Sequence, residues 1–292
     1  MPELPEVETV CRGLNALLRG HWIISVQCNW FKSFPVSPEH EAALVLGARF
    51  VRVHRRAKLI IIELDNGYSL VTHLKMTGQL VFIADSGQRF GAGHPSDSLV
   101  DTLPDRSTRV VFELDNARLF FNDQRKFGWM QLVSTAEVPK MDFVRKLGPE
   151  PLEDSFTPQV FRDALQRRKR SCIKAALLDQ TVLAGIGNIY ADEALWSAQI
   201  HPESKVQELS AVVTEKLWRK LRAVLELSIR EGGSSDRNYV NAEGKRGAYL
   251  NFAKVFRRQG KPCLRCGLTI QKIRVAGRGT HLCPGCQVRI ER

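Results

Sequence analysis

The chain of 292 residues contains no apolar run that approaches the roughly 18 residues with which a helix crosses a bilayer. It has no Lys/Arg-rich helix with a bulky apolar face, the feature expected of a protein that lies on a membrane surface. It also has no recognisable signal peptide, internal repeat or low-complexity tail. These absences argue against membrane and secreted proteins, and they favour a cytoplasmic protein with one large or two ordinary domains.

Acidic residues are fewer than basic residues, and most of the difference lies in the C-terminal part of the chain. The sequence has 43 Lys+Arg and 31 Asp+Glu, a formal net charge of +12. From Asp236 to the end there are 13 Lys+Arg and 3 Asp+Glu, so the rest of the chain is nearly neutral. A basic segment of this kind indicates a polyanionic partner, most simply DNA or RNA.

Cysteine is also scarce, and four of the 7 cysteines form one pattern near the C-terminus. Two Cys-x2-Cys pairs are separated by 16 residues, and their members are Cys263, Cys266, Cys283 and Cys286. This spacing places four thiolates around one tetrahedral metal and predicts a structural zinc site. The alternative is two disulfides in a secreted protein. It is disfavoured because no signal peptide is evident and the other cysteines are scattered.

Periodicity predicts an N-terminal helix followed by a β-rich region. Apolar residues recur at helical spacing over Pro5–Gly20. The segments that follow are rich in β-branched and aromatic residues and predict strands at Trp22–Gln27, Arg49–His54, Leu59–Leu64, Ser69–His73, Gln79–Ile83, Arg109–Leu114 and Arg118–Phe121. Short strands after one helix indicate a β-sandwich or barrel. The Gly-, Pro-, Ser- and Asp-rich stretch Asp85–Ser107 is expected to be a long surface loop.

The second half of the chain is predicted to be helical. The expected helices are Pro158–Arg168, Cys172–Asp179, Ile189–Ser197 and Leu209–Arg230. The result is an α+β chain with an N-terminal β-sandwich domain over residues 1–135 and a linker over 136–150. A helical domain over 151–235 and a loop with the metal-binding hairpin over 236–292 complete it.

The first residues, Met-Pro-Glu-Leu-Pro-Glu, carry a possible nucleophile. Pro2 is small enough for Met1 to be removed, which would leave a secondary amine. An α-amino group titrates at about 7.7–8, so part of it is neutral at physiological pH and can form an iminium with a sugar carbon. Glu3 and Glu6 are close enough in sequence to move protons. On the residues alone a structural alternative stays open, because Pro5 and early glutamates also suit the first turn of a helix.

The opening Pro2–Val10 resembles the start of the bacterial formamidopyrimidine-DNA glycosylases. Four later segments resemble the same family in the same order, namely His73–Gly78, Leu147–Leu152, Asp179–Tyr190 and Gly277–Cys286. The resemblance covers almost the whole chain. It implies an N-terminal helix with a β-sandwich, a helix-two-turn-helix domain and a four-cysteine zinc finger. It also implies a bifunctional DNA glycosylase/AP lyase of base excision repair, which removes 8-oxoguanine and formamidopyrimidines.

The same resemblance assigns chemical roles to residues of this chain. Pro2 would attack C1′ of the damaged nucleotide and displace the base, and the Schiff base would then undergo β- and δ-elimination. Glu3 would act as acid/base near the sugar, and Glu6 as a supporting carboxylate. Lys58 would act at the lesion phosphate or in elimination, although a solvated cation beside a strand is the alternative on the residues alone. Arg278, at the tip of the finger hairpin, would contact the backbone beside the lesion and assist elimination.

Further residues match the family's contacts to double-stranded DNA. His73, Lys169 and Lys174 are among the expected contacts. Asn188 would bind backbone at the start of a helix, after a glycine-rich turn that suits phosphate. On the residues alone, a basic run such as that around Lys169 is usually a solvated face, and the turn before Asn188 is a weak motif for which a simple cap is the alternative.

Excision of a base from a duplex requires the nucleotide to leave the stack. The resemblance implies that Met76, Arg125 and Phe127 fill the gap, with Arg125 facing the orphaned base. Without the resemblance, Met76 and Phe127 could equally be core residues. The loop 234–247 resembles the segment that closes over 8-oxoguanine. Its candidate contacts are Tyr239, Val240 and Asn241.

The sequence departs from the family pattern near the gap-filling residues. Gln124 and Lys126 flank Arg125 where many members have Pro and Arg, which puts phosphate contacts there in doubt. Ser107 stands roughly where some members have a DNA-contacting histidine.

Two other functions stay open at this point. One is an endonuclease-VIII-type glycosylase for oxidised pyrimidines on the same scaffold. The other is a non-catalytic DNA-binding zinc protein that retains Met1 and binds lesions without nicking. The favoured interpretation is a monomeric, nucleoid-associated enzyme of the cytoplasm. It would hold one structural zinc ion and act on double-stranded DNA with oxidised bases or abasic sites.

Overall fold

The computed structural model describes residues 1–35, 41–94, 97–99, 101–234 and 248–290. The chain divides into two compact units, Met1–Arg145 with Glu231–Ala248 and Lys146–Arg230 with Tyr249–Arg292. The candidate lesion contacts Tyr239, Val240 and Asn241 lie outside the described residues. Within the described ranges, every helix is too short or too polar to traverse a bilayer.

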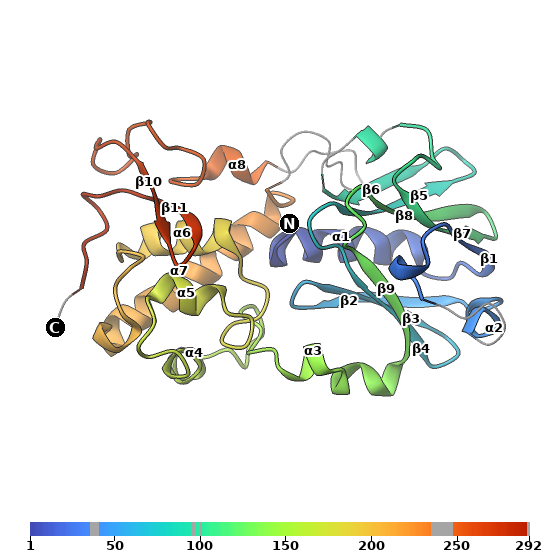
Figure 1. Cartoon of the computed structure of the whole chain (residues 1–292), viewed down its shortest axis with the longest axis horizontal. Coiled ribbons are helices and arrows are strands. Elements are labelled where there is room, and N and C mark those ends of the chain that lie inside the picture. The colour runs from blue at the N-terminus through green and yellow to red at the C-terminus, as the bar shows by residue number, and fades with distance from the viewer. Residues whose placement is uncertain (36–40, 95–96, 100, 235–247, 291–292) are drawn as a thin grey trace. The chain divides into compact units, whose positions relative to one another are not determined.

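The N-terminal unit consists of helix α1 (Leu4–Leu18) and two antiparallel sheets (Figure 1). One sheet has the strand order β1-β7-β8-β5-β6, and the other has the order β2-β3-β4-β9. The strands are β1 Ile23–Cys28, β2 Phe50–Arg56, β3 Leu59–Leu64, β4 Tyr68–His73, β5 Gly78–Ala84, β6 Arg89–Gly93, β7 Thr108–Leu114, β8 Ala117–Asp123 and β9 Trp129–Ser134. The short helical segments are η1 Phe31–Ser33, α2 Glu41–Val45, η2 Asp97–Leu99, η3 Thr135–Lys140 and α3 Asp142–Arg145.

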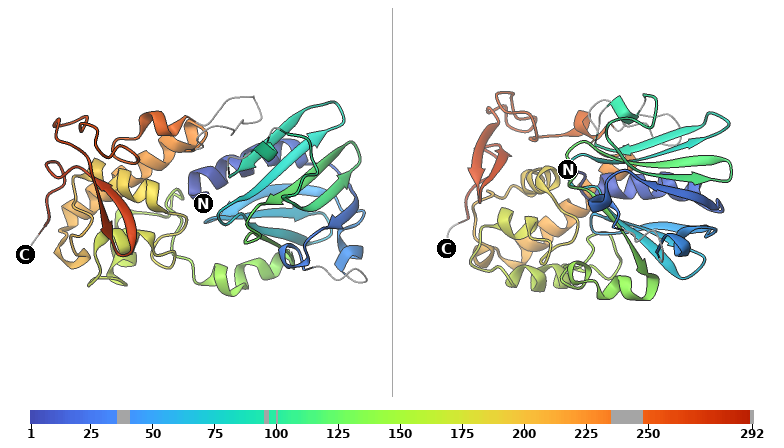
Figure 2. Two further views of the ribbon diagram at one scale, coloured as in Figure 1. Left: turned by 45° about the horizontal axis from the view of Figure 1, so that its top comes forward. Right: turned by 45° about the vertical axis from the view of Figure 1, so that its right-hand side comes forward.

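Helix α1 packs against strands of both sheets, and Figure 2 shows it from two further sides. Its apolar stripe, including Val7, Val10 and Leu14, is fully buried in the main core. The ring of Phe90 lies where a side chain at Gly13 would be, because a Cβ there would sit 2.2 Å from Phe90 Cζ. The helix is thus fixed by burial of its apolar face, with its first residues at one end of this core.

The predicted N-terminal helix and the predicted strands are confirmed, and the structure adds β6 and β9. The prediction that Asp85–Ser107 is a long loop is wrong, because β6 lies within it and pairs with β5 from Gln79–Gly93 to Ile83–Arg89. The glycines of β6 make its composition resemble that of a loop. A Cβ on Gly91 would lie 3.0 Å from Leu99 Cδ2, and Gly93 has a φ of 129°.

The second unit is mainly helical. Its elements are α4 Pro158–Gln166, α5 Ile173–Leu178, α6 Asn188–Ala198, η4 Val206–Glu208, α7 Ala211–Arg230, α8 Tyr249–Phe252, β10 Gln271–Val275 and β11 Arg278–Leu282. Helix α4 begins after Thr157, whose hydroxyl accepts the N–H of Val160, and α6 packs along α7. The four predicted helices are confirmed, as is the α+β fold with a two-stranded hairpin near the C-terminus.

Candidate active site and nucleic-acid interface

The first residues of the chain are buried at the start of α1. Pro2 is buried, and Glu3 and Glu6 are 4% and 7% exposed, whereas Met1 is 49% exposed. Glu3 precedes the first helical residue, and its N–H donates to Glu6 Oε2 at 2.9 Å. The other oxygen, Glu6 Oε1, accepts the N–H of Ser234 at 2.7 Å. The glutamates therefore cap the start of α1, and both lie close enough to the Met1 amino group to affect its pKa.

Burial of the chain start favours a neutral amine. Burial lowers the pKa of the Met1 amino group below its ordinary value, Glu3 and Glu6 oppose this shift, and Lys58 adds to it. The Pro2 nitrogen is part of a peptide bond while Met1 is present. Removal of Met1 would convert it into a secondary amine among the same three side chains.

Lys58 lies in the two-residue turn between β2 and β3, where Arg56 pairs with Leu59. Its neighbour Ala57 has a φ of 53°, a left-handed conformation that is uncommon for a residue with a Cβ. Lys58 is 5% exposed and lies close enough to lower the pKa of both the Met1 amino group and the His73 ring. The alternative of a solvated cation beside a strand is therefore wrong.

His73 ends β4 and is 5% exposed. Burial, followed by the charges of Lys75 and Lys58, lowers the pKa of His73 to about 3. Its Nδ1 accepts the backbone N–H of Lys75 at 2.9 Å. The neutral ring therefore carries its proton on Nε2, which makes it a hydrogen-bond donor without a charge.

Met76, Arg125 and Phe127 project from two neighbouring turns, β4–β5 and β8–β9. Met76 is 42% exposed and Phe127 is 55% exposed, so the alternative that they are core residues is wrong. Arg125 Cζ lies 4.8 Å from the centroid of the Phe127 ring. This places a guanidinium and an aromatic ring together at the surface, with a flexible thioether on the adjoining turn.

Two of the three residues that depart from the family pattern, Lys126 and Ser107, have partners within this unit. Lys126 Nζ lies 3.9 Å from the ring centroid of Trp30, so its charge is directed onto an aromatic face. Ser107 is 3% exposed and donates to Asp105 Oδ1 at 2.6 Å. Ser107 thus belongs to an internal hydrogen-bond network.

In the second unit, the turn before α6 is tightly constructed. Gln180 Oε1 accepts the N–H of Gly185 at 3.0 Å, and the N–H of Gly148 donates to the backbone oxygen of Gln180 at 2.8 Å. A Cβ on Gly148 would lie 2.5 Å from the backbone of Val182. Close approach of two backbones therefore requires glycine at 148.

Asn188 is the first residue of α6 and connects this turn to the hairpin β10–β11. Its Nδ2 donates to the backbone oxygen of Gly279 at 2.9 Å, and its buried Oδ1 has no partner among the described residues. Arg278 is exposed and begins β11, directly after Ala276 and Gly277, which have φ values of 47° and 77°. Two left-handed residues give the tight hairpin turn that holds Arg278 at its edge.

Lys169 is exposed, as a phosphate contact requires, but the prediction of a phosphate contact for Lys174 is wrong. Lys174 is fully buried and forms an ion pair with Asp192, whose side chain is also fully buried. Asp192 Oδ2 accepts the backbone N–H of His281 at 2.9 Å. The pair therefore ties α5, α6 and β11 together inside the unit and leaves the ammonium no access to solvent.

The four predicted zinc ligands come together in the hairpin region. Their sulfur atoms lie within 4.8 Å of one another, and the distances Cys263–Cys286 and Cys266–Cys283 are 3.8 and 3.3 Å. A disulfide requires about 2.05 Å. Tetrahedral zinc with bonds of about 2.3 Å separates its sulfurs by about 3.8 Å, which fits this cluster. Burial and the neighbouring sulfurs raise the pKa of Cys286 to about 12, so a cation is needed to keep four thiolates together. The four cysteines hold one structural zinc ion.

Comparison with known proteins identifies the family. The model of the formamidopyrimidine-DNA glycosylase N-terminal domain matches residues 1–130, the model of the H2TH domain matches 147–239, and that of the zinc finger found in FPG and IleRS matches 260–288. The chain belongs to the formamidopyrimidine-DNA glycosylase family. Members of this family are DNA glycosylases with AP lyase activity that act on oxidised purines. The resemblance noted in the sequence is thereby confirmed.

Similar proteins match along their whole length. The formamidopyrimidine-DNA glycosylase of Chloroflexus aurantiacus is 42% identical, and the match covers 100% of this chain and 99% of the relative. That of Herpetosiphon aurantiacus is 43% identical over 98% of this chain and 100% of the relative. The Lactococcus lactis enzyme, solved with DNA containing an abasic site, has a TM-score of 0.86 at 35% identity and covers 98% of this chain and 100% of its own. It was also solved with DNA containing N7-benzyl-Fapy-dG (TM-score 0.85, 35% identity, 99% and 100% coverage).

Three buried acids that organise the site could not be identified from the sequence. Asp123 accepts hydrogen bonds from the turn that carries Arg125. Asp192 neutralises Lys174. Glu193 accepts three backbone N–H groups just before the finger, and burial raises its pKa although these bonds oppose the shift. Only the contacts with residues distant in the sequence show the role of each acid.

Proposed function

We propose that Pro2, freed by removal of Met1, is the nucleophile of this glycosylase. The observation that carries the proposal is the burial of Pro2 beside Glu3, Glu6 and Lys58 in an environment that lowers the pKa of the terminal amine. The neutral amine attacks C1′ of the damaged nucleotide, the N–C1′ bond forms, and the glycosidic bond breaks with its electrons leaving on the base. The attacking nitrogen then loses its proton, and its lone pair forms the iminium as the C1′–O4′ bond breaks and O4′ takes up a proton.

The neighbouring side chains move protons in this scheme. Glu3 lies beside the nucleophile and serves as the acid/base at the sugar ring. Lys58, a movable point charge held near the chain start, binds the lesion phosphate or takes part in proton transfer during β- and δ-elimination. Glu6 supports the site through its two backbone hydrogen bonds and does not touch the substrate.

Double-stranded DNA containing oxidised bases or abasic sites is the proposed substrate. Asn188, Lys169 and Arg278 would contact its backbone, and the uncharged His73 would donate from Nε2. The zinc ion is structural, because four thiolates leave no coordination position open for chemistry. In this proposal it holds the hairpin that carries Arg278.

The chain's functions divide along its length in this proposal. The catalytic residues and the gap-filling side chains lie in residues 1–135, and a linker over 136–150 follows. The helix-two-turn-helix contacts come from residues 151–235, and the lesion-capping loop and the zinc finger come from 236–292. In the loop, Tyr239, Val240 and Asn241 remain candidate contacts to the base. We further infer that the protein acts as a monomer in the cytoplasm, at the nucleoid.

Substrate choice and the state of the N-terminus test the proposal. The protein should nick a duplex with 8-oxoguanine opposite cytosine faster than one with thymine glycol. A preference for thymine glycol would contradict the purine assignment and favour the endonuclease-VIII-type alternative. N-terminal mass spectrometry should find Pro2 first. Retained Met1, with lesion binding but no nicking, would favour the non-catalytic alternative.

A further inference from the structure

We propose that Asp123, together with Thr77, is the positioning unit that holds Met76, Arg125 and Phe127 in place for gap filling. The inference rests on the proposed function, because it takes these three side chains to occupy the space of an extruded base. It assigns a role to a buried carboxylate that touches neither the substrate nor the nucleophile.

The Asp123 carboxylate joins two turns that are 46 residues apart in sequence. It is fully buried at the end of β8. Its Oδ1 accepts the Thr77 hydroxyl and, at 3.1 Å, the backbone N–H of Arg125. Its Oδ2 accepts the backbone N–H of Gly128 at 2.6 Å. One carboxylate therefore closes the turn 123–128 from both sides and ties it to Thr77, the residue after Met76.

The Thr77 hydroxyl completes this connection. It donates to Asp123 and also lies 3.1 Å from the backbone nitrogen of Arg125, whose N–H it accepts. Gly78 and Asp123 are paired in the β5–β8 ladder, so the two turns leave the same end of one sheet from adjacent strands. The register of the sheet brings the two turns together, and the two side chains lock them.

Both turns have backbone conformations that require support. Lys75 has a φ of 49° and Lys126 a φ of 60°, left-handed values that are unfavourable for residues with a Cβ. A Cβ on Gly128 would lie 3.1 Å from Asp123 Oδ2, so the chain passes close to the carboxylate. Because Phe127 is 55% exposed, its turn rather than the packing of its own ring determines where it points.

Two matched pairs of variants test the inference. Asp123→Asn keeps the shape but presents an oxygen on one side only, so either the N–H of Gly128 or the Thr77 hydroxyl and the N–H of Arg125 lose their acceptor. Thr77→Val removes the bridging hydroxyl at nearly constant volume, and Thr77→Ser retains it. Asp115→Asn is the control, because Asp115 accepts the N–H of Trp22 in a different turn of the same sheet. Thermal unfolding verifies that each variant is folded.

Two assays separate positioning from general damage. Base extrusion is followed by stopped-flow fluorescence of 2-aminopurine beside 8-oxoguanine in a duplex. Chemistry is followed by nicking of a single-stranded abasic oligonucleotide, in which no base is extruded and no gap is filled. Asp123→Asn and Thr77→Val should slow extrusion about tenfold or more, as Phe127→Ala should, which corresponds to about 1.4 kcal/mol. They should nick the single strand at nearly the wild-type rate, and Thr77→Ser and Asp115→Asn should resemble wild type in both assays.

Equal slowing of extrusion and single-strand nicking would overturn the inference, because it indicates a general structural role. Unchanged extrusion in both Asp123→Asn and Thr77→Val would overturn it as well. A wild-type protein that fails to nick either substrate would instead contradict the proposed function, and that result is visible without any variant.

Discussion

Glu6 and Ser234 are joined by a hydrogen bond of 2.7 Å although 228 residues separate them in the chain. Gly233, directly before Ser234, has a φ of 87°, and a Cβ there would lie 3.2 Å from Glu6 Oε1. Glycine is therefore required for both conformation and space. The same carboxylate binds the N–H of Glu3, so it fixes the start of the helix that carries the proposed nucleophile.

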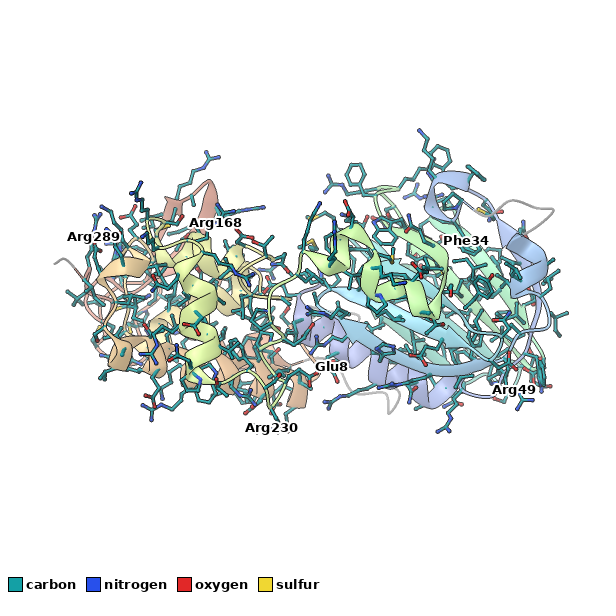
Figure 3. All side chains as sticks on the ribbon, turned by 90° about the horizontal axis from the view of Figure 1, so that it is seen from below. Glu8, Phe34, Arg49, Arg168, Arg230 and Arg289 are labelled. Atoms are coloured by element: carbon teal, nitrogen blue, oxygen red, sulfur yellow. The ribbon has the colours of Figure 1, made fainter. Side chains whose placement is uncertain are left out.

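Replacement of Glu6 should impair the site without removing the nucleophile. In Glu6→Gln one of the two backbone N–H donors, from Glu3 or Ser234, faces an NH2 group. Loss of a hydrogen bond to a charged acceptor costs about 1.5–3 kcal/mol, and we expect a comparable loss of unfolding free energy together with slower excision. Urea unfolding and single-turnover excision measure these effects. Glu8→Gln is the matched control, because Glu8 lies on the same helix (Figure 3) and pairs with Arg55 instead. Equal effects in both variants would contradict a special role for Glu6.

The buried pair Lys174–Asp192 should contribute strongly to the stability of the second unit. Asp192→Ala removes the carboxylate that compensates a fully buried ammonium, and we expect a loss of about 3–5 kcal/mol in unfolding free energy. Glu203→Ala removes a half-exposed partner of Arg289 at 3.9 Å and should cost about 0–1 kcal/mol. Urea unfolding of both variants makes the comparison. Similar losses of unfolding free energy in the two variants would contradict a stabilising role for the buried pair Lys174–Asp192.

Zinc removal should abolish DNA binding and strand cutting together, because both are proposed to depend on the hairpin that carries Arg278. Chelation should weaken duplex binding at least about tenfold, which corresponds to about 1.4 kcal/mol, and added zinc should restore it. Fluorescence anisotropy with a labelled duplex measures binding. Cys283→Ser should resemble the chelated protein, whereas Cys172→Ser should not, since Cys172 is outside the four-sulfur cluster. Full duplex binding by the chelated protein would contradict this role of the finger.

His73 should make the protein less stable in acid. Its pKa of about 3 in the folded chain lies below the ordinary 6.5, so the unfolded chain binds the proton more readily between these values. Stability is unaffected by this group above about pH 6.5 and falls as the pH is lowered, by up to about 1.4 kcal/mol per unit. Between pH 7 and 5.5, wild type should therefore lose about 1 kcal/mol more unfolding free energy than His73→Gln. Equal losses in urea unfolding would show that His73 is not held neutral.

Local patterns were sufficient to predict most of the fold and the metal site. Burial of one face leaves a periodic pattern of apolar residues in the sequence, which identified the helix before Gly20 and the strands. The zinc site was identified from the spacing of its paired cysteines alone. Strand β6 was missed because Gly91 and Gly93 make its composition resemble a loop. In the structure they allow close approach of neighbouring segments, and Gly93 also has a positive φ within the strand.

The error at Lys174 has a different physical origin. Because Lys174 lies next to the basic run 167–170, it is expected to be a solvated cation. Its burial follows only from the position of Asp192 on another helix. Asp123 was overlooked for the same reason, since its partner Thr77 is 46 residues away. Charged residues whose role is set by distant partners cannot be identified from their neighbours in sequence.

Borohydride trapping on a duplex with 8-oxoguanine opposite cytosine tests the central claim most directly. The reagent reduces an iminium between Pro2 and C1′ to a stable amine, so the protein should become covalently attached to the DNA. Peptide mapping should locate the adduct on the N-terminal proline, and Pro2→Gly and Glu3→Gln should give much less of it. Efficient nicking without a trapped adduct, or an adduct at Lys58 instead of Pro2, would contradict the account.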